Sequence, residues 1–79
     1  MAQQKVLVVD DEATVRDVIA RYLALEGYEV ASAGDGAEGL RLARSWGPDL
    51  VVLDIMLPAM DGLTVCRTLR AESRVPVIM

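Results

Sequence analysis

Residues 51–62 read VVLDIMLPAMDG, an apolar run that meets an aspartate, Asp54, and breaks soon afterwards at a proline and a glycine. The run is the core of a predicted strand at residues 49–54, the most hydrophobic strand of the chain. A second run, KVLVV at residues 5–9, is continuous, short and β-branched, which is typical of a strand buried on both faces of a parallel sheet. Both strands end in carboxylates, because Asp10 follows one and Asp54 closes the other.

The segments between and after these strands alternate in type. Two more strands are predicted, at residues 28–32 and 75–79. Three helices are predicted from apolar residues at helical spacing, which are Val15, Val18, Ile19, Tyr22 and Leu23, then Leu40, Ala43 and Trp46, then Leu63, Cys66 and Leu69. The order β-α-β-α-β-α-β implies an α/β fold, with a parallel sheet that is covered by helices on both faces. Residues 1–79 contain no linker and are expected to form one domain.

Capping residues predict where the helices begin and end. Thr14 with Asp17 resembles a capping box at the start of the first helix. Asp35, with Glu38 three residues later, is predicted to cap the second helix. The predicted stops of these helices are Gly27 and the pair Gly47-Pro48. Structural roles are also expected for residues that stand out by type, namely Asp49 and Asp61 in turns or strand starts, Trp46 at a helix end, and Cys66, Met56, Met60 and Met79 in packing.

Composition excludes several classes of function. The 79 residues carry 12 acids against 8 bases, a net charge of -4, and no basic stripe, so this segment is not expected to bind nucleic acid directly. No apolar run is long enough to cross a bilayer, and the amino terminus does not resemble a signal peptide. Cys66 is the only cysteine, which fits a reducing, cytoplasmic location. The absence of histidine excludes Ser-His and Cys-His catalysis and metal sites that need imidazole.

The acids that end the two apolar strands obey one rule. In open α/β sheets, ligands bind beyond the carboxyl ends of the strands. If the two strands are neighbours, Asp10, Asp11 and Asp54 converge on one pocket. An aspartate after a strand often only caps the next helix, so Asp10 and Asp11 alone would favour a structural role. The matching position of Asp54 on a second strand favours a site instead.

Three carboxylates in one pocket repel one another unless a cation joins them. Mg2+ fits such a site, because it takes a few carboxylates, accepts a carbonyl and keeps several waters. A carboxylate beside such an ion can also act as a nucleophile toward phosphorus, which gives an acyl phosphate.

The motifs VLVVDDE, VVLDIMLPAMDG and RVPVIM, taken together, resemble the receiver domain of bacterial two-component response regulators. The resemblance runs along the whole chain. The stretch LDIMLPAMDGLTVCRTLR is also similar to receivers that carry a winged-helix DNA-binding output domain, which implies transcription regulation. The resemblance implies a flavodoxin-like sheet of order 2-1-3-4-5, of which this chain would hold the order 2-1-3-4, without the fifth strand and the last two helices.

The resemblance also implies roles for individual residues. Asp54 would be the phosphoacceptor, which takes a phosphoryl group from a sensor histidine kinase. Asp10 and Asp11 would help to hold Mg2+, with Asp11 the more direct ligand, and the backbone carbonyl of Met56 would complete the protein ligands. Two more residues would shape the adjacent loop, Pro58 and Gly62.

The family's pattern continues beyond the last residue, Met79, with a Ser/Thr, a lysine and an aromatic residue that serve phosphotransfer and switching. Both processes are therefore expected to be impaired in this fragment. The strand at residues 75–79 would be a bare apolar edge, and such edges recruit partners. Self-association through this strand, including exchange of segments in a dimer, is therefore expected.

Two other functions stay open at this point. One is a self-associating structural fragment of a receiver that does not signal. The other is a phosphatase with an aspartyl-phosphate intermediate. Phosphatases of that kind usually place a second acid two residues after the nucleophile, where this chain has Met56, which argues against that function.

Overall fold

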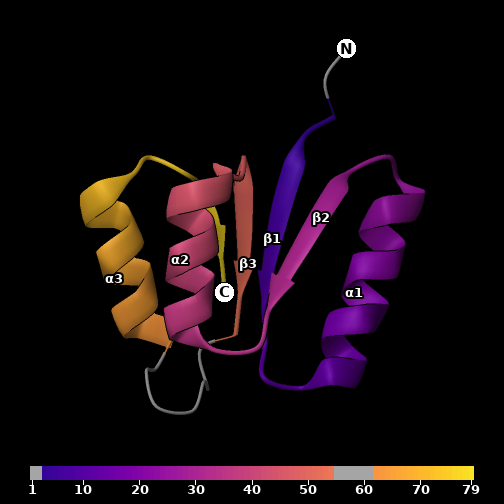
Figure 1. Ribbon diagram of the computed structural model, residues 1–79, viewed down its shortest axis with the longest axis horizontal. Helices are drawn as coiled ribbons and strands as arrows, with labels where there is room; N and C mark the ends of the chain where they lie inside the picture. Colours follow the sequence, from indigo (N-terminus) through magenta and orange to yellow (C-terminus); the bar gives the residue numbers. More distant parts are fainter. Residues whose placement is uncertain (1–2, 55–61) are drawn as a thin grey trace.

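The computed structural model describes residues 3–54 and 62–79, and all structural statements below concern these residues. They form one parallel sheet with the strand order β2-β1-β3-β4, which confirms the predicted topology. The strands are β1 (Lys5–Val9), β2 (Glu29–Ala33), β3 (Leu50–Leu53) and β4 (Val77–Ile78), and the helices are α1 (Ala13–Leu25), α2 (Gly36–Trp46) and α3 (Gly62–Glu72). Figure 1 shows the elements along the chain.

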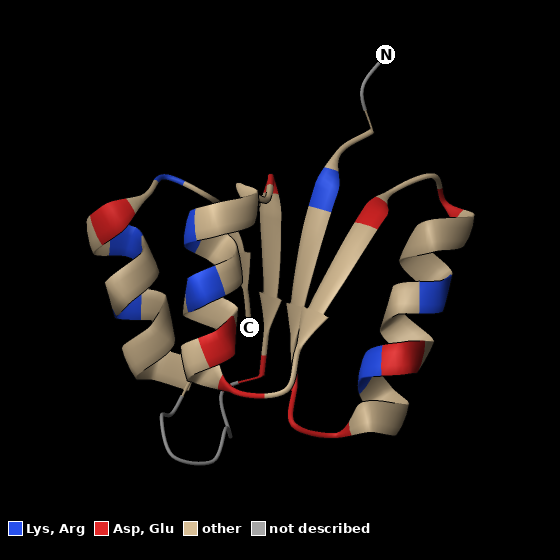
Figure 2. Ribbon diagram, in the orientation of Figure 1, with Lys and Arg blue, Asp and Glu red and all other residues tan. Residues whose placement is uncertain are grey.

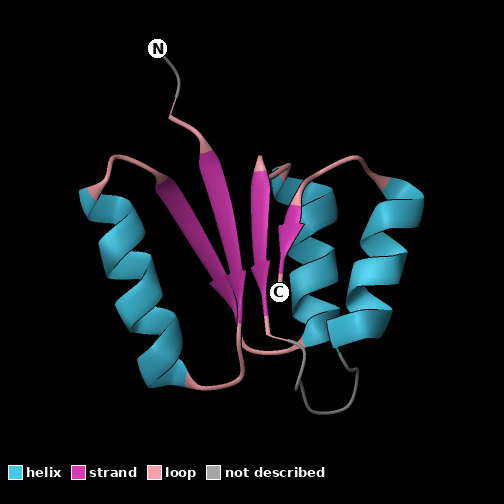
Figure 3. Ribbon diagram, turned by 180° about the vertical axis from the view of Figure 1, so that it is seen from behind, coloured by secondary structure: helices cyan, strands magenta, loops and turns pink. Residues whose placement is uncertain are grey.

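The sheet separates two helical layers. Helix α1 lies on one face, and α2 and α3 lie side by side on the other, as the front and back views show (Figures 1 and 3). Strand β1 alternates between these faces, yet Val6, Leu7, Val8 and Val9 are all buried. Burial on both faces explains why β1 is apolar throughout and does not alternate with polar residues.

The main core lies between the sheet and the α2–α3 layer. It consists of Leu7, Val9, Ala33, Leu40, Val51, Leu53, Val65, Cys66 and Leu69, so Cys66 packs in the core as predicted. Helix α2 approaches β1 closely at Gly39, where an added Cβ would lie 2.9 Å from Cγ2 of Val9. A larger residue would therefore force α2 away from the strand.

Helix α1 is less buried than its apolar stripe predicts. Ile19 and Leu23 are half-buried, but Tyr22 is 69% exposed and Val18 is 48% exposed. The stripe is wider than the surface that α1 shares with β1 and β2, and α1 is the one helix on this face within the described ranges. The apolar spacing correctly predicts a helix here, but only part of its stripe is covered by the described sheet.

The helix ends agree with the capping predictions at three of four places. Asp35 accepts a hydrogen bond from the backbone N–H of Glu38 at 2.8 Å, and Gly27 and Gly47 adopt positive φ angles of 93° and 67°. The capping box at Thr14 is wrong, because α1 begins at Ala13 and its N-cap residue makes no side-chain capping bond. The Asp10 carboxylate closes the turn before the helix instead, because it accepts a hydrogen bond from the backbone N–H of Glu12.

The amino end of the sheet is pinned by reciprocal bonds between β1 and the residue before β3. The backbone N–H of Asp49 donates to the carbonyl of Lys5 at 2.8 Å, and the N–H of Lys5 donates to Oδ2 of Asp49, also at 2.8 Å. The Lys5 ammonium lies 5.5 Å from the centre of the Trp46 ring. Asp49 is thus a strand-start residue, as predicted, and Trp46 lies at the amino end of the sheet.

Strand β4 is shorter than predicted. Only Val77 and Ile78 are strand, since Pro76 has no N–H and takes part through its carbonyl, which accepts from Val51 at 2.9 Å. Ile78 and Met79 are more than half exposed, so the prediction that Met79 fills a packing gap is wrong. This strand forms the outer edge of the described sheet.

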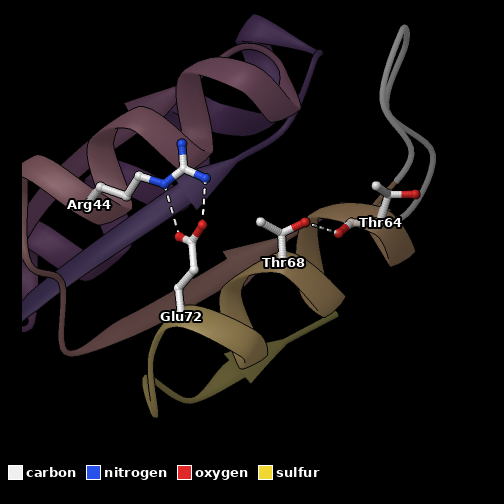
Figure 4. A network of polar contacts seen from close by, with 4 residues as sticks. All are labelled: Arg44, Thr64, Thr68 and Glu72. Carbon is white, nitrogen blue, oxygen red and sulfur yellow. Dashed lines mark hydrogen bonds and ion pairs between the residues drawn. The ribbon is translucent and has the colours of Figure 1, made fainter.

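An ion pair joins the ends of α2 and α3 (Figure 4). The Arg44 guanidinium donates to both carboxylate oxygens of Glu72, at 2.9 and 2.6 Å. In the same view, the Thr68 hydroxyl donates to the Thr64 carbonyl at 2.9 Å within α3. The two hydrogen bonds and the charge of Arg44 lower the pKa of Glu72, and Glu72 in turn raises the pKa of Arg44.

The lowered pKa of Glu72 makes a pH-dependent contribution to stability. A carboxylate whose pKa is lower in the folded state stabilises the fold above its unfolded pKa, and the contribution is lost as the pH falls through the folded pKa. We therefore expect Glu72→Gln to destabilise the protein slightly at pH 7, and the difference from the parent to vanish as the pH falls from about 5 through the lowered pKa of Glu72. Urea unfolding across this range, with Glu29→Gln as the control, measures the difference. If the loss of stability in Glu72→Gln did not change with pH, the ion pair with Arg44 would not be its cause.

Candidate metal centre

The site is built by the pairing of β1 with β3. The two strands run parallel in a register that ends with Val9 opposite Leu53, so the next residues, Asp10 and Asp54, leave the sheet side by side. The backbone N–H of Asp54 donates to the Val9 carbonyl at 2.9 Å, and the N–H of Asp10 donates to the Ala33 carbonyl of β2 at 3.1 Å. Backbone bonds thus fix the positions of both aspartates.

The three predicted acids come together as the sequence analysis expects. Asp10, Asp11 and Asp54 each offer a carboxylate oxygen, and these oxygens all lie within 4.8 Å of one another. Asp10 and Asp54 are half-buried, while Asp11 is exposed. In Figure 2, acidic segments follow both β1 and β3 at the lower edge of the sheet. The carboxyl ends of two adjacent strands therefore carry a concentrated negative charge.

Asp10 also has the structural role that the alternative hypothesis gave it. Its Oδ1 accepts a hydrogen bond from the backbone N–H of Glu12 at 2.9 Å, which closes the turn that leads into α1. A carboxylate has two oxygens with several acceptor positions, so this bond does not prevent Asp10 from binding a cation. The two roles are compatible, and the turn orients the carboxylate.

The donor set fits a hard divalent cation. Oxygen donors from three carboxylates suit Mg2+ or a similar ion, whereas histidine is absent from the chain and Cys66 is buried in the core. A cation would also offset the mutual repulsion of the acids. Met56, Pro58 and Asp61 lie outside the described residues, while Gly62 is the buried first residue of α3.

Sequence reasoning missed one residue beside this site. The sequence alone assigned no role to Arg16. In the structure its Nη1 donates to the backbone carbonyl of Asp10 at 2.8 Å. The position of Arg16 in the first turn of the helix after the acidic loop was the available signal. The direction of its side chain, however, depends on the turn before α1, which is closed by Asp10 and not by the predicted capping box at Thr14.

Comparison with known proteins gives a consistent result. The family model described as "Response regulator receiver domain" matches residues 6–79. The chain is 49% identical over 79 residues to a protein named "Probable transcriptional regulator ycf27" from Porphyridium aerugineum, and 48% identical over 77 residues to "DNA-binding response regulator MtrA" from Mycobacterium tuberculosis. It spans about a third of the length of these curated relatives, 33% and 34% respectively.

Solved structures resemble the fold closely. The activated N-terminal receiver domain of RstA from Klebsiella pneumoniae aligns with a TM-score of 0.90 and 38% identity, over 94% of this chain and 63% of that one. The chemotaxis response regulator CheY4 of Vibrio cholerae aligns with a TM-score of 0.92 and 33% identity, over 96% and 66% of the two chains. In the described part of the chain, every helix is too short or too polar to cross a bilayer.

The mutual repulsion of the three acids can be measured through stability. Asp11→Asn removes one exposed charge from the cluster without touching the turn that Asp10 makes. In chelator at low salt we expect the melting temperature to rise by a few degrees, since like charges at this separation cost roughly 1 kcal/mol even in a water-like dielectric. Calorimetry measures the melting temperatures of Asp11→Asn and of the control Glu29→Gln, which removes one negative charge at the other end of the sheet. A rise that persists at about 1 M salt, or an equal rise for Glu29→Gln, would contradict local repulsion.

Proposed function

This chain belongs to the family of response regulator receiver domains, and on that premise we propose that Asp54 accepts a phosphoryl group from a sensor histidine kinase. The observation that carries the proposal is the convergence of three carboxylates within 4.8 Å at the ends of β1 and β3. Receiver domains are phosphoacceptor signalling domains and not enzymes in the usual sense. We assign the Mg2+ ligands to Asp10, Asp11, Asp54 and the backbone carbonyl of Met56.

The chemistry of the step follows from the position of Asp54. One of its carboxylate oxygens attacks the phosphorus of a phosphohistidine, the new O–P bond forms as the P–N bond breaks, and the electron pair of that bond stays on the imidazole. The backbone bond from Asp54 to Val9 holds the nucleophile at the edge of the sheet. A bound Mg2+ supplies positive charge to the carboxylates and the phosphoryl oxygens.

Asp10 and Asp11 would both bind the cation, but their surroundings differ. Asp10 is oriented by its bond with the Glu12 N–H and presents a half-buried carboxylate to the cation. Asp11 is exposed and would supply a second carboxylate oxygen to the cation, which in such sites also keeps several water ligands. Both acids lie close to Asp54 because β1 and β3 are paired.

We place this receiver in a cytoplasmic transcription regulator. The supporting observation is that relatives about half identical to the chain are named as DNA-binding or transcriptional regulators, of which the chain spans a third. Residues 1–79 would then form one receiver unit, shorter than the solved receivers it resembles. Because this segment has a net charge of -4, we expect any contacts with DNA to come from other parts of such a protein. Impaired phosphotransfer and switching stay predictions from the sequence.

The central test is covalent labelling. With Mg2+ and labelled acetyl phosphate, we expect at most one phosphoryl group per chain, carried by Asp54, and we expect this label to be lost on Asp54→Asn and on removal of Mg2+ with a chelator. Asp17→Asn, which removes an exposed acid of α1, is the matched control and should label as the parent does. Intact-mass spectrometry and acid-quenched counting measure the label. Equal labelling of Asp54→Asn would refute the assignment, and continuous turnover of phosphate esters would support the phosphatase instead.

A second candidate, a self-associating fragment, is favoured by the exposed edge of β4. Ile78 is 55% exposed on a strand that pairs on one side only within the described sheet. For a polypeptide of these 79 residues, we therefore infer association through β4.

Sedimentation velocity at increasing concentration tests this association. We expect a growing dimer fraction that Ile78→Lys abolishes, because an edge lysine resists further strand pairing. Leu63→Lys is the control, since Leu63 on α3 is 54% exposed and equally apolar. A compact monomer at high concentration, or an equal loss of dimer in both variants, would exclude association through β4.

A further inference from the structure

A single basic side chain lies against the acidic loop in the described structure, and the mechanism above does not use it. Arg16 sits in the first turn of α1, where its backbone N–H donates to the Glu12 carbonyl at 3.0 Å. Its side chain turns back toward the strand and is partly buried. There Nη1 donates to the backbone carbonyl of Asp10 at 2.8 Å. Arg16 therefore binds both ends of the segment that carries Asp10 and Asp11.

The guanidinium also contacts a neighbouring loop. A Cβ placed on Gly34, just after β2, would lie 3.3 Å from Nη1 of Arg16 and 3.8 Å from its Cζ. The backbone of Gly34 does not have a positive φ, so conformation alone does not require glycine there. An added Cβ at this distance would require the guanidinium to shift by a few tenths of an ångström, so the close approach of Arg16 favours glycine at this position. The same loop is tied to Asp10 through the bond from the Asp10 N–H to the Ala33 carbonyl.

We propose that Arg16 is a positioning residue for the cation site, and this proposal rests on the proposed function. Its guanidinium fills the space between the Asp10 carbonyl and Gly34, and so fixes the loop from which the carboxylates of Asp10 and Asp11 project. Arg16 donates to a backbone oxygen and leaves the carboxylates to the cation. In this way it acts through Asp10 and does not itself touch the ion.

The charge of Arg16 makes the proposal easy to test, because two effects have opposite signs. A positive charge near the site repels a cation, so removing it would tighten Mg2+ binding if charge were all that mattered. Loss of a group that orients ligands weakens metal binding instead, typically by tenfold or more. The direction of the change in Mg2+ affinity therefore distinguishes positioning from simple electrostatics.

The experiment is a titration of the 79-residue chain with Mg2+, followed through the amide NMR signals of Asp10, Asp11 and Asp54. We expect Arg16→Met to weaken binding about tenfold, and Arg16→Lys, which keeps one donor, to lie between it and the parent. Arg21→Met removes the same charge from α1 one turn and a half further on, and should bind as the parent does. Unchanged or tighter binding by Arg16→Met would overturn the proposal.

A double-mutant cycle with Gly34 tests the contact itself. Gly34→Ala should weaken Mg2+ binding in the parent, since its Cβ crowds the guanidinium at 3.3 Å. In the Arg16→Met background the same change should have no effect, because the shorter thioether side chain can move aside. Equal effects in both backgrounds would mean that Gly34 acts independently of Arg16, and the proposal would be wrong.

Hydrogen exchange separates this proposal from the proposed function. The Glu12 amide bonds to Asp10 Oδ1 and reports the order of the loop without any metal. We expect its exchange to be several-fold faster in Arg16→Met than in the parent, in chelator, with the core amides unchanged. If the parent does not bind Mg2+, the proposed function fails. Faster exchange of the Glu12 amide in Arg16→Met would still show that Arg16 fixes the loop that carries Asp10 and Asp11. Unchanged exchange at Glu12 would overturn it.

Discussion

The parallel pairing of β1 with β3 is the constraint on which the rest of the molecule depends. The register runs from Val6 opposite Leu50 to Val9 opposite Leu53, and it is held at both ends. At the amino end, Asp49 and Lys5 exchange two bonds of 2.8 Å, and at the carboxyl end the Asp54 N–H binds the Val9 carbonyl. These bonds at the two ends fix which residues of β1 and β3 lie opposite one another.

Core packing supplies the free energy that holds the acids together. Leu7, Val9, Val51 and Leu53 lie in one cluster with side chains of α2 and α3, and each is at most 2% exposed. Burying side chains of this size stabilises a fold by about 1.5–3 kcal/mol each, which is more than the repulsion between partly solvated carboxylates costs. The strands can therefore present three acids at one edge, and a cation recovers part of that cost. The buried middle of β1 and β3 therefore holds in place the acidic site at the carboxyl ends of the same strands.

The strands and the acids at their ends follow from strong, local signals in the sequence, whereas the strand order came from the resemblance to receiver domains. KVLVV and the run before Asp54 are typical of buried strands, and the crevice rule brings Asp10, Asp11 and Asp54 together once these two strands are neighbours. The failures have physical causes. The capping box predicted at Thr14 is wrong because the Asp10 carboxylate closes the turn instead, and the exposure of Tyr22 was not foreseen because periodicity does not show how wide the contact with the sheet is. The contact of Arg16 with Gly34 joins helix α1 to the loop after β2, and only the structure shows that these two segments meet.

The most direct measurement of the central claim is the broadening of amide NMR signals by Mn2+, a paramagnetic ion that takes similar oxygen ligands. If the ends of β1 and β3 share one cation, sparse Mn2+ should broaden Asp10, Asp11 and Asp54 first and together, leave Lys5 and Leu50 at the opposite end sharp, and be displaced by Mg2+. Trp46 fluorescence is a poor substitute, because that ring lies beside Lys5 at the far end of the sheet. Broadening of Asp11 without Asp54, or broadening spread equally over Glu26, Glu29 and Glu72, would contradict a shared site.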